Sequence, residues 1–85
     1  KQAAAKPSYF VQIASFREEE TAEALRDRLA KKGYKVQVTP VHLQEMGLWY
    51  RVKLGGYEDL QEAQEAQRKI SFEEGFTGTT VISEP

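Results

Sequence analysis

The segment GLWYRVKLGGY, residues 47–57, contains the only tryptophan of the chain and alternates bulky side chains with cationic ones. Such alternation predicts a strand, because successive side chains of a strand point to opposite faces of a sheet. Trp49 and Arg51 then share one face, and Tyr50 and Val52 share the other. Only one of these faces fits a small core, so the fold depends on which face the rest of the chain covers.

The size and composition of the chain predict one soluble, folded domain. It has 85 residues, 40% of them hydrophobic and 29% charged, with a net charge of −1 at pH 7. A chain of this size buries only about 60–65% of its unfolded surface, so there is room for one core. The near-neutral charge provides no general attraction to nucleic acid. Zero cysteines exclude disulfides and thiolate metal sites, and no apolar run reaches the roughly 20 residues of a membrane span.

Hydrophobic periodicity divides the chain into alternating strands and helices. A period of two predicts strands, and a period near 3.6 predicts helices with one apolar side. Gly33 and Gly75 follow the two helical patterns, as glycine does at helix C-termini. Pro40 removes a backbone donor, which predicts an edge strand or a bulge. The expected elements are strands at 8–16, 34–44, 47–57 and 76–83, and helices at 17–32 and 59–74.

The two halves of the chain repeat each other at an offset of 41 residues. The helix positions Ala22 and Leu29 match Ala63 and Ile70, and the flanking strand positions match at the same offset. Two such βαβ halves predict an α+β fold of the ferredoxin-like or RNP-like type, because each crossover is right-handed. This βαββαβ sandwich has a four-stranded antiparallel sheet, two helices on one face and the other face open.

The helices determine which side of each strand is buried. Their narrow stripes of Ala, Leu and Ile require the aliphatic side of the strands. Val52 is therefore expected inside with Tyr50, and Trp49 outside. The open face then combines an aromatic side chain with polar and cationic ones, which favours an anionic ligand. The residues expected on this face are Phe10, Gln12, Lys35, Trp49, Arg51 and Lys53.

Enzymatic function is not expected for this domain. The single histidine, His42, has no cysteine with which to pair, and a lone histidine in a strand is usually a surface residue. The carboxylates gather in the first turns or on the outer faces of the predicted helices, where the helix dipole and solvent account for them. The glycines of LGGY lack the following lysine and serine or threonine of a phosphate-binding loop. We therefore expect no catalytic residue, metal or cofactor here, although the parent protein could carry a separate enzymatic domain.

Two classes of polymer fit an open face of this kind. RNA-recognition modules have the same element order, but their third strand carries a glycine-aromatic run that WYRVKLGGY lacks. A carbohydrate polymer needs an indole for the apolar face of a sugar ring, and amide or guanidinium groups for hydroxyls, acetamides and carboxylates. We favour the carbohydrate. An RNA-recognition-type module and a protein-interaction or regulatory module remain alternatives.

Two motifs of the chain resemble the SPOR domain, the sporulation-related repeat. YFVQIASF, residues 9–16, resembles its first strand, and WYRVKLGGY, residues 49–57, resembles its third. The resemblance covers about residues 8–82. It indicates a domain at 8–85, with residues 1–7 as the end of a linker, because KQAAAKPS is small, polar and marked by proline. The natural chain is expected to extend further towards its N-terminus.

The resemblance implies a peptidoglycan-binding module of the bacterial cell envelope. Members of the family recognise denuded glycan strands, from which stem peptides have been removed, and direct their parent proteins to the division septum. We therefore expect a periplasmic or cell-envelope location with an N-terminal tether. We also expect the domain to be monomeric, to bind no nucleic acid and to make no direct contact with the membrane. In the last strand, the family's groove-facing aliphatic position falls at Thr80, or at Val81 if the register differs. The implied glycan contacts are Gln12, Ser15, Trp49 and Arg51, with Phe10, Lys53 and Thr80 added from the open face.

Overall fold

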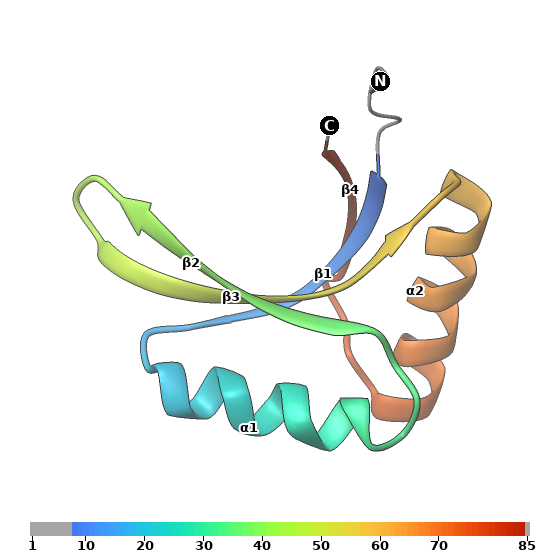
Figure 1. Cartoon of the computed structure of the whole chain (residues 1–85), viewed down its shortest axis with the longest axis horizontal. Coiled ribbons are helices and arrows are strands. Elements are labelled where there is room, and N and C mark those ends of the chain that lie inside the picture. The colour runs from blue at the N-terminus through green and yellow to red at the C-terminus, as the bar shows by residue number, and fades with distance from the viewer. Residues whose placement is uncertain (1–7, 85) are drawn as a thin grey trace, which may run out of the picture.

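The computed structural model describes residues 8–84. The predicted linker at 1–7 lies outside this range. No helix of the described range is long and apolar enough to cross a membrane. The elements follow the expected βαββαβ order (Figure 1): β1 Ser8–Phe16, α1 Glu19–Ala30, β2 Val36–Leu43, β3 Gly47–Tyr57, α2 Leu60–Glu74 and β4 Thr80–Glu84.

The strands form one antiparallel sheet in the order β2-β3-β1-β4. Both helices cover one face of this curved sheet, and no other element of the described range covers the opposite face (Figure 1). The predicted α+β fold with an open sheet face is confirmed. β2 is an edge strand, and Pro40 lies within it opposite Tyr50. An edge strand tolerates the missing donor of Pro40 because one of its sides has no ladder to complete.

The core lies between the helices and the inner face of the sheet. α1 buries Ala22 and Leu29, and α2 buries Ala63 and Ile70, which are the positions matched by the repeat. Tyr50 packs against this core, as expected for the side of β3 opposite Trp49. Phe16 and Tyr57, the last residues of β1 and β3, pack against it too. The fully buried large side chains are Val11, Leu29, Val52, Leu54 and Ile70.

The elements end where local hydrogen bonds favour other partners. α1 is two residues shorter at each end than predicted. At its C-terminal end, the N–H groups of Lys32 and Gly33 bond three residues back and tighten the chain into a turn. Asp59 caps the N-terminus of α2, because its carboxylate accepts from the N–H of Glu62 at 2.8 Å. β4 begins later than predicted, because both oxygens of Thr79 accept from a side-chain amide of α2.

Two bulges interrupt the pairing of β1 with β3. In β3 the extra residue falls at Gly55–Gly56, opposite Phe10, and in β1 it falls at Ile13–Ala14, opposite Val52. Both residues of the second bulge face inward. Simple alternation from Phe10 and Gln12 would turn Ala14 to the open face, but with the bulge Ala14 packs against the core. Bulges increase bend and twist, which agrees with the strong curvature of this part of the sheet (Figure 1).

Candidate functional site

A row of polar side chains crosses the open face of all four strands. Gln12 of β1 lies opposite Lys53 of β3 on one side and opposite Thr80 of β4 on the other. Lys53 in turn lies opposite Gln37 of β2. Residues directly opposite each other in an antiparallel sheet project from the same face. Thr80 is exposed at the β4 end of this row, and its register confirms it as the open-face residue in preference to Val81, which packs inward.

The bulge in β1 adds Ser15 to the same face. On a regular strand Gln12 and Ser15 would point to opposite faces, because their separation is odd. The extra residue at Ile13–Ala14 changes this parity, so that Ser15 lies opposite Arg51 and is exposed. Arg51 is half-buried and forms no ion pair within residues 8–84. Its guanidinium charge therefore remains available for a ligand.

Trp49 extends this face towards the turn between β2 and β3. Its indole N–H donates to the carbonyl of Met46 at 3.2 Å, which orients a ring that is only half-buried. The guanidinium carbon of Arg17 lies 5.2 Å from the centre of the indole, in the range of a cation–π contact. The sequence patterns did not identify Arg17, because it follows the last residue of β1 and no alternation extends to it. Trp49 is thus flanked by Arg17 and, two positions along its strand, by Arg51.

The other end of the face is closed by a packed cluster. Phe10 and Lys53 are only 9% and 8% exposed, although both lie on the predicted face. The Lys53 ammonium lies 4.5 Å from the centre of the Phe10 ring and 2.9 Å from a carboxylate oxygen of Glu84. The expectation that Lys53 is an exposed cation is wrong, because its charge is already paired by β4. Ile82 lies opposite Phe10, two residues after Thr80, and adds an aliphatic side chain to this end of the face.

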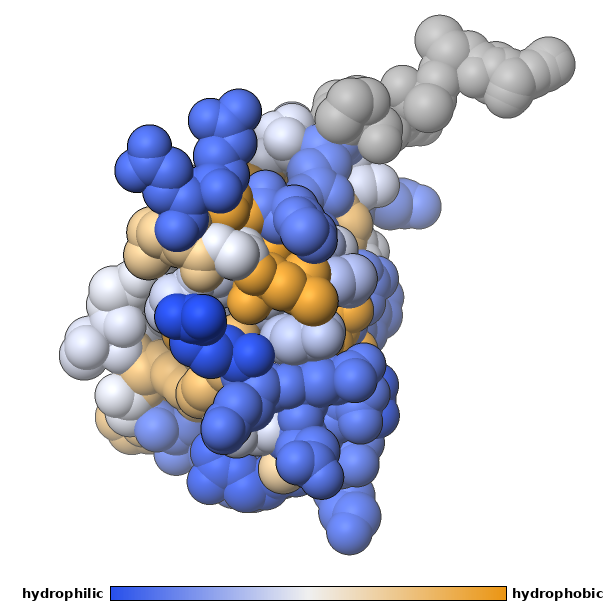
Figure 2. All heavy atoms as spheres, turned by 90° about the vertical axis from the view of Figure 1, so that its left-hand side faces the viewer, coloured by the Kyte–Doolittle hydropathy of each residue, from blue (hydrophilic) through white to orange (hydrophobic). Residues whose placement is uncertain are grey.

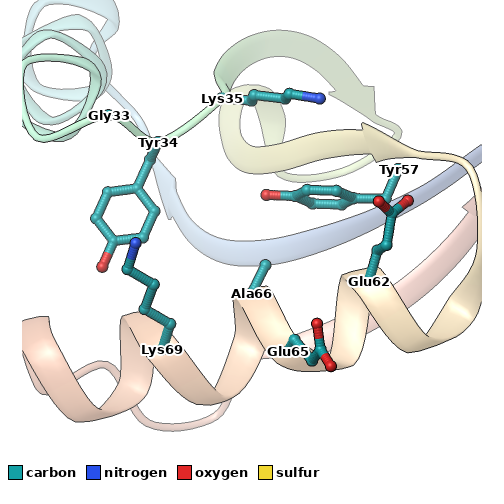
Figure 3. A pocket seen from close by; sticks show the side chains of 8 residues that line it. All are labelled: Gly33, Tyr34, Lys35, Tyr57, Glu62, Glu65, Ala66 and Lys69. Atoms are coloured by element: carbon teal, nitrogen blue, oxygen red, sulfur yellow. The ribbon is translucent and has the colours of Figure 1, made fainter.

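The expectation that Lys35 belongs to the open face is also wrong. Its ammonium lies 5.6 Å from the ring centre of Tyr57, and both residues line a pocket on the helix side (Figure 3). Lys35 precedes β2, so strand alternation does not determine its direction.

β2 adds three further residues to the open face. Gln37, Thr39 and Val41 lie opposite the outward-facing residues of β3, and the side-chain amide of Gln37 donates to the carbonyl of Gly55 at 3.3 Å. The alternation of Val36 with Val38 could have identified them, since their neighbours must face outward. Figure 2 views the molecule from the β2–β3 turn. It shows a hydrophobic patch directly beside strongly hydrophilic side chains, as an amphipathic ligand requires.

The geometry defines a class of protein. An open sheet that presents indole, amide, hydroxyl and guanidinium groups is suited to bind an extended polar ligand. The described residues contain no group of three or more His, Cys, Asp or Glu side chains that could hold a metal ion. The open face of the sheet is the candidate site of a ligand-binding module.

Comparison with known proteins specifies the family. The family model of the SPOR domain matches residues 5–83, and the chain belongs to this family. It is similar to the solution structure of the peptidoglycan-binding domain of the B. subtilis cell wall lytic enzyme CwlC, with a TM-score of 0.68. The two are 25% identical over 100% of this chain and 99% of that chain. No curated protein matches the sequence.

Proposed function

We propose that this domain binds peptidoglycan through the open face of its sheet and breaks no bond in it. The observation that carries this proposal is the continuous surface of Gln12, Ser15, Arg51 and Trp49, which exists because a bulge places Ser15 opposite Arg51. Family membership and the similarity to a peptidoglycan-binding domain support the choice of polymer. Such a domain places its parent protein at the cell wall.

Each group on this face matches a chemical feature of the glycan. The indole of Trp49 stacks on the apolar face of a pyranose ring. Arg51 pairs with a carboxylate, and Gln12 bonds to an acetamide or hydroxyl group. Thr80, opposite Gln12 on β4, and Ser15, three residues further along β1, provide exposed hydroxyls. Phe10 and Lys53 have little exposed surface, because the Lys53 ammonium packs over the Phe10 ring and pairs with Glu84, so they support the face.

This arrangement favours denuded strands. Cleaving the bond between muramic acid and its stem peptide uncovers a lactyl carboxylate, which pairs with Arg51 or Arg17. It also removes a bulky peptide that prevents a strand from lying flat on the sheet. Septal localisation of the parent protein follows where amidases act during division. The affinity of one shallow face is modest, about micromolar, and repeated sites along each strand strengthen attachment.

Cosedimentation with purified sacculi tests the proposal. We expect binding to increase after amidase treatment, and to fall about tenfold in Trp49→Ala and in Gln12→Ala, from the loss of stacking or of a hydrogen bond. Phe72→Ala is the matched control, because Phe72 is a 91% exposed aromatic side chain on α2. If cosedimentation does not change after amidase treatment, the preference for denuded strands is contradicted. Binding that survives both substitutions, or stronger binding to RNA, contradicts the glycan-binding face.

A further inference from the structure

A pocket of about 340 Å³ lies on the helix side of the molecule (Figure 3). It is bounded by α2, by the residues that precede β2 and by the end of β3. Its volume is at the lower end of the roughly 300–1,000 Å³ typical of small-molecule sites. The lining side chains that carry chemistry are Tyr34, Lys35, Tyr57, Glu62, Glu65 and Lys69.

Two tyrosines shape the walls of this pocket. Tyr34 is held in place because its ring is buried and its hydroxyl donates to Glu73, and the Lys69 ammonium lies 5.3 Å from the ring centre. The hydroxyl of Tyr57 points into the pocket (Figure 3) and has no hydrogen-bond partner within residues 8–84. Burial, and secondarily the charge of Glu62, raises the pKa of Tyr57. This hydroxyl therefore remains a proton donor at neutral pH.

The pocket is lined by charges of both signs. Lys35 and Lys69 form no ion pair within the described range, and neither does Glu65. Glu62 accepts a hydrogen bond from the backbone of Glu58 and so remains an acceptor at the rim. An anion or a cation alone would meet a like charge in this pocket. A ligand with one charge of each sign meets an opposite partner at both ends.

We propose that this pocket binds a short peptide with a free amino end and a free carboxylate end. The carboxylate accepts from the Tyr57 hydroxyl and pairs with Lys35 or Lys69, and the ammonium pairs with Glu62 or Glu65. Ala66, which forms the pocket floor on α2 (Figure 3), leaves room for a small apolar side chain between these charges.

The hydrolysis that denudes a glycan strand produces such a peptide. Adding water to the amide bond leaves a carboxylate on the sugar and an ammonium on the released peptide. One product then suits the open face of the sheet, and the other suits the pocket on the opposite side. This assignment of the peptide's source rests on the proposed function, whereas the charge pattern of the pocket does not.

The test is an NMR titration of the ¹⁵N-labelled domain with alanyl-alanine. We expect shifts at the amides of Gly33, Lys35 and Ala66, with millimolar affinity. Acetylating the amino end or amidating the carboxylate should each weaken binding about tenfold, because each removes a charge-assisted contact. Tyr57→Phe should weaken it by about the same factor, and the matched control Tyr50→Phe should not. Equal shifts from the blocked and unblocked peptides, or full binding by Tyr57→Phe, would overturn the proposal.

Two further arms identify the source and separate the two sites. Peptides released from sacculi by amidase should shift the same amides, whereas sacculi that retain their stem peptides should not. If stem peptides still attached to sacculi shift the pocket amides as much as released peptides do, a free amino end is not required and the proposal fails. Trp49→Ala should lose binding to sacculi but keep the peptide shifts. Conversely, Tyr57→Phe should keep binding to sacculi, so failure at one site is distinguishable from failure at the other.

Discussion

Replacing Gly55 by alanine should destabilise the domain strongly, because Gly55 is tightly enclosed at the bulge of β3. Its φ is +129°, which side chains rarely adopt, and a Cβ there would lie 2.8 Å from the carbonyl oxygen of Tyr9. It would also lie 2.9 Å from Cδ2 of the Phe10 ring. The Tyr9 oxygen belongs to the backbone of β1 and cannot move without disturbing the pairing of β1 with β3.

The expected cost of Gly55→Ala has three parts. Backbone strain costs about 1–3 kcal/mol, overpacking costs a further ~1–3 kcal/mol, and the reduced freedom of the unfolded chain returns about 0.5–1 kcal/mol. The free energy of unfolding should therefore fall by about 1–5 kcal/mol. Gly75→Ala is the matched control, since its φ is +74° but a Cβ there meets nothing within 4 Å. This control should cost only about 1 kcal/mol.

Urea unfolding followed by circular dichroism measures the difference between the two variants. Thermal unfolding gives a second reading, because each kcal/mol shifts the Tm of a domain of this size by roughly 4–8 °C. Failure of Gly55→Ala to fold, with Gly75→Ala folded, agrees with the upper end of the range. A cost for Gly55→Ala no larger than that of Gly75→Ala would refute the steric argument and the packing of Phe10 on this bulge.

Three further substitutions test individual contacts. Arg17→Ala should reduce cosedimentation with sacculi several-fold but change the free energy of unfolding by less than about 1 kcal/mol, because its contact with Trp49 is exposed. Glu84→Ala should lower the free energy of unfolding by about 1–2 kcal/mol, measured as a fall in the melting temperature. It leaves Lys53 buried and unpaired, although Glu84 itself is 42% exposed. Burial, followed by hydrogen bonding to a carboxylate, raises the pKa of Tyr34 above its value in the unfolded chain. The protonated hydroxyl therefore contributes its full stabilisation of the fold below about pH 10, and this stabilisation is lost as the pH rises further. The free energy of unfolding, measured between pH 8 and 11.5, should therefore fall more steeply with pH for the wild type than for Tyr34→Phe. Parallel pH dependences of the two proteins would contradict this.

The fold could be predicted because its determinants are periodic. The apolar stripe of each helix repeats at the same positions, Ala22 and Leu29 in one and Ala63 and Ile70 in the other, and all four are buried. Once these stripes require the aliphatic side of the strands, the placement of Trp49 on the open face follows from alternation alone. Most of the candidate site depends on this one inference.

The remaining features depend on contacts between residues distant in the sequence. The pairing of Lys53 with Glu84 requires β4 to lie beside β1 in one particular register, which no local pattern specifies. Lys35 precedes its strand, so its direction depends on the position of Tyr57 near α2. The contact of Arg17 with Trp49 likewise joins the end of β1 to the β2–β3 turn.

The bulges show why strand alternation failed at the proposed binding face. One lies on each side of the stretch in which Val11 pairs with Leu54 and Gln12 with Lys53. Without the bulge at Ile13–Ala14, a strand that presents Gln12 to the open face would turn Ser15 into the core, and the face would lose its hydroxyl opposite Arg51. Ala14 is small enough to be accepted as the extra inward residue. The irregularity that defeats a sequence pattern is thus the feature that brings the proposed binding groups together.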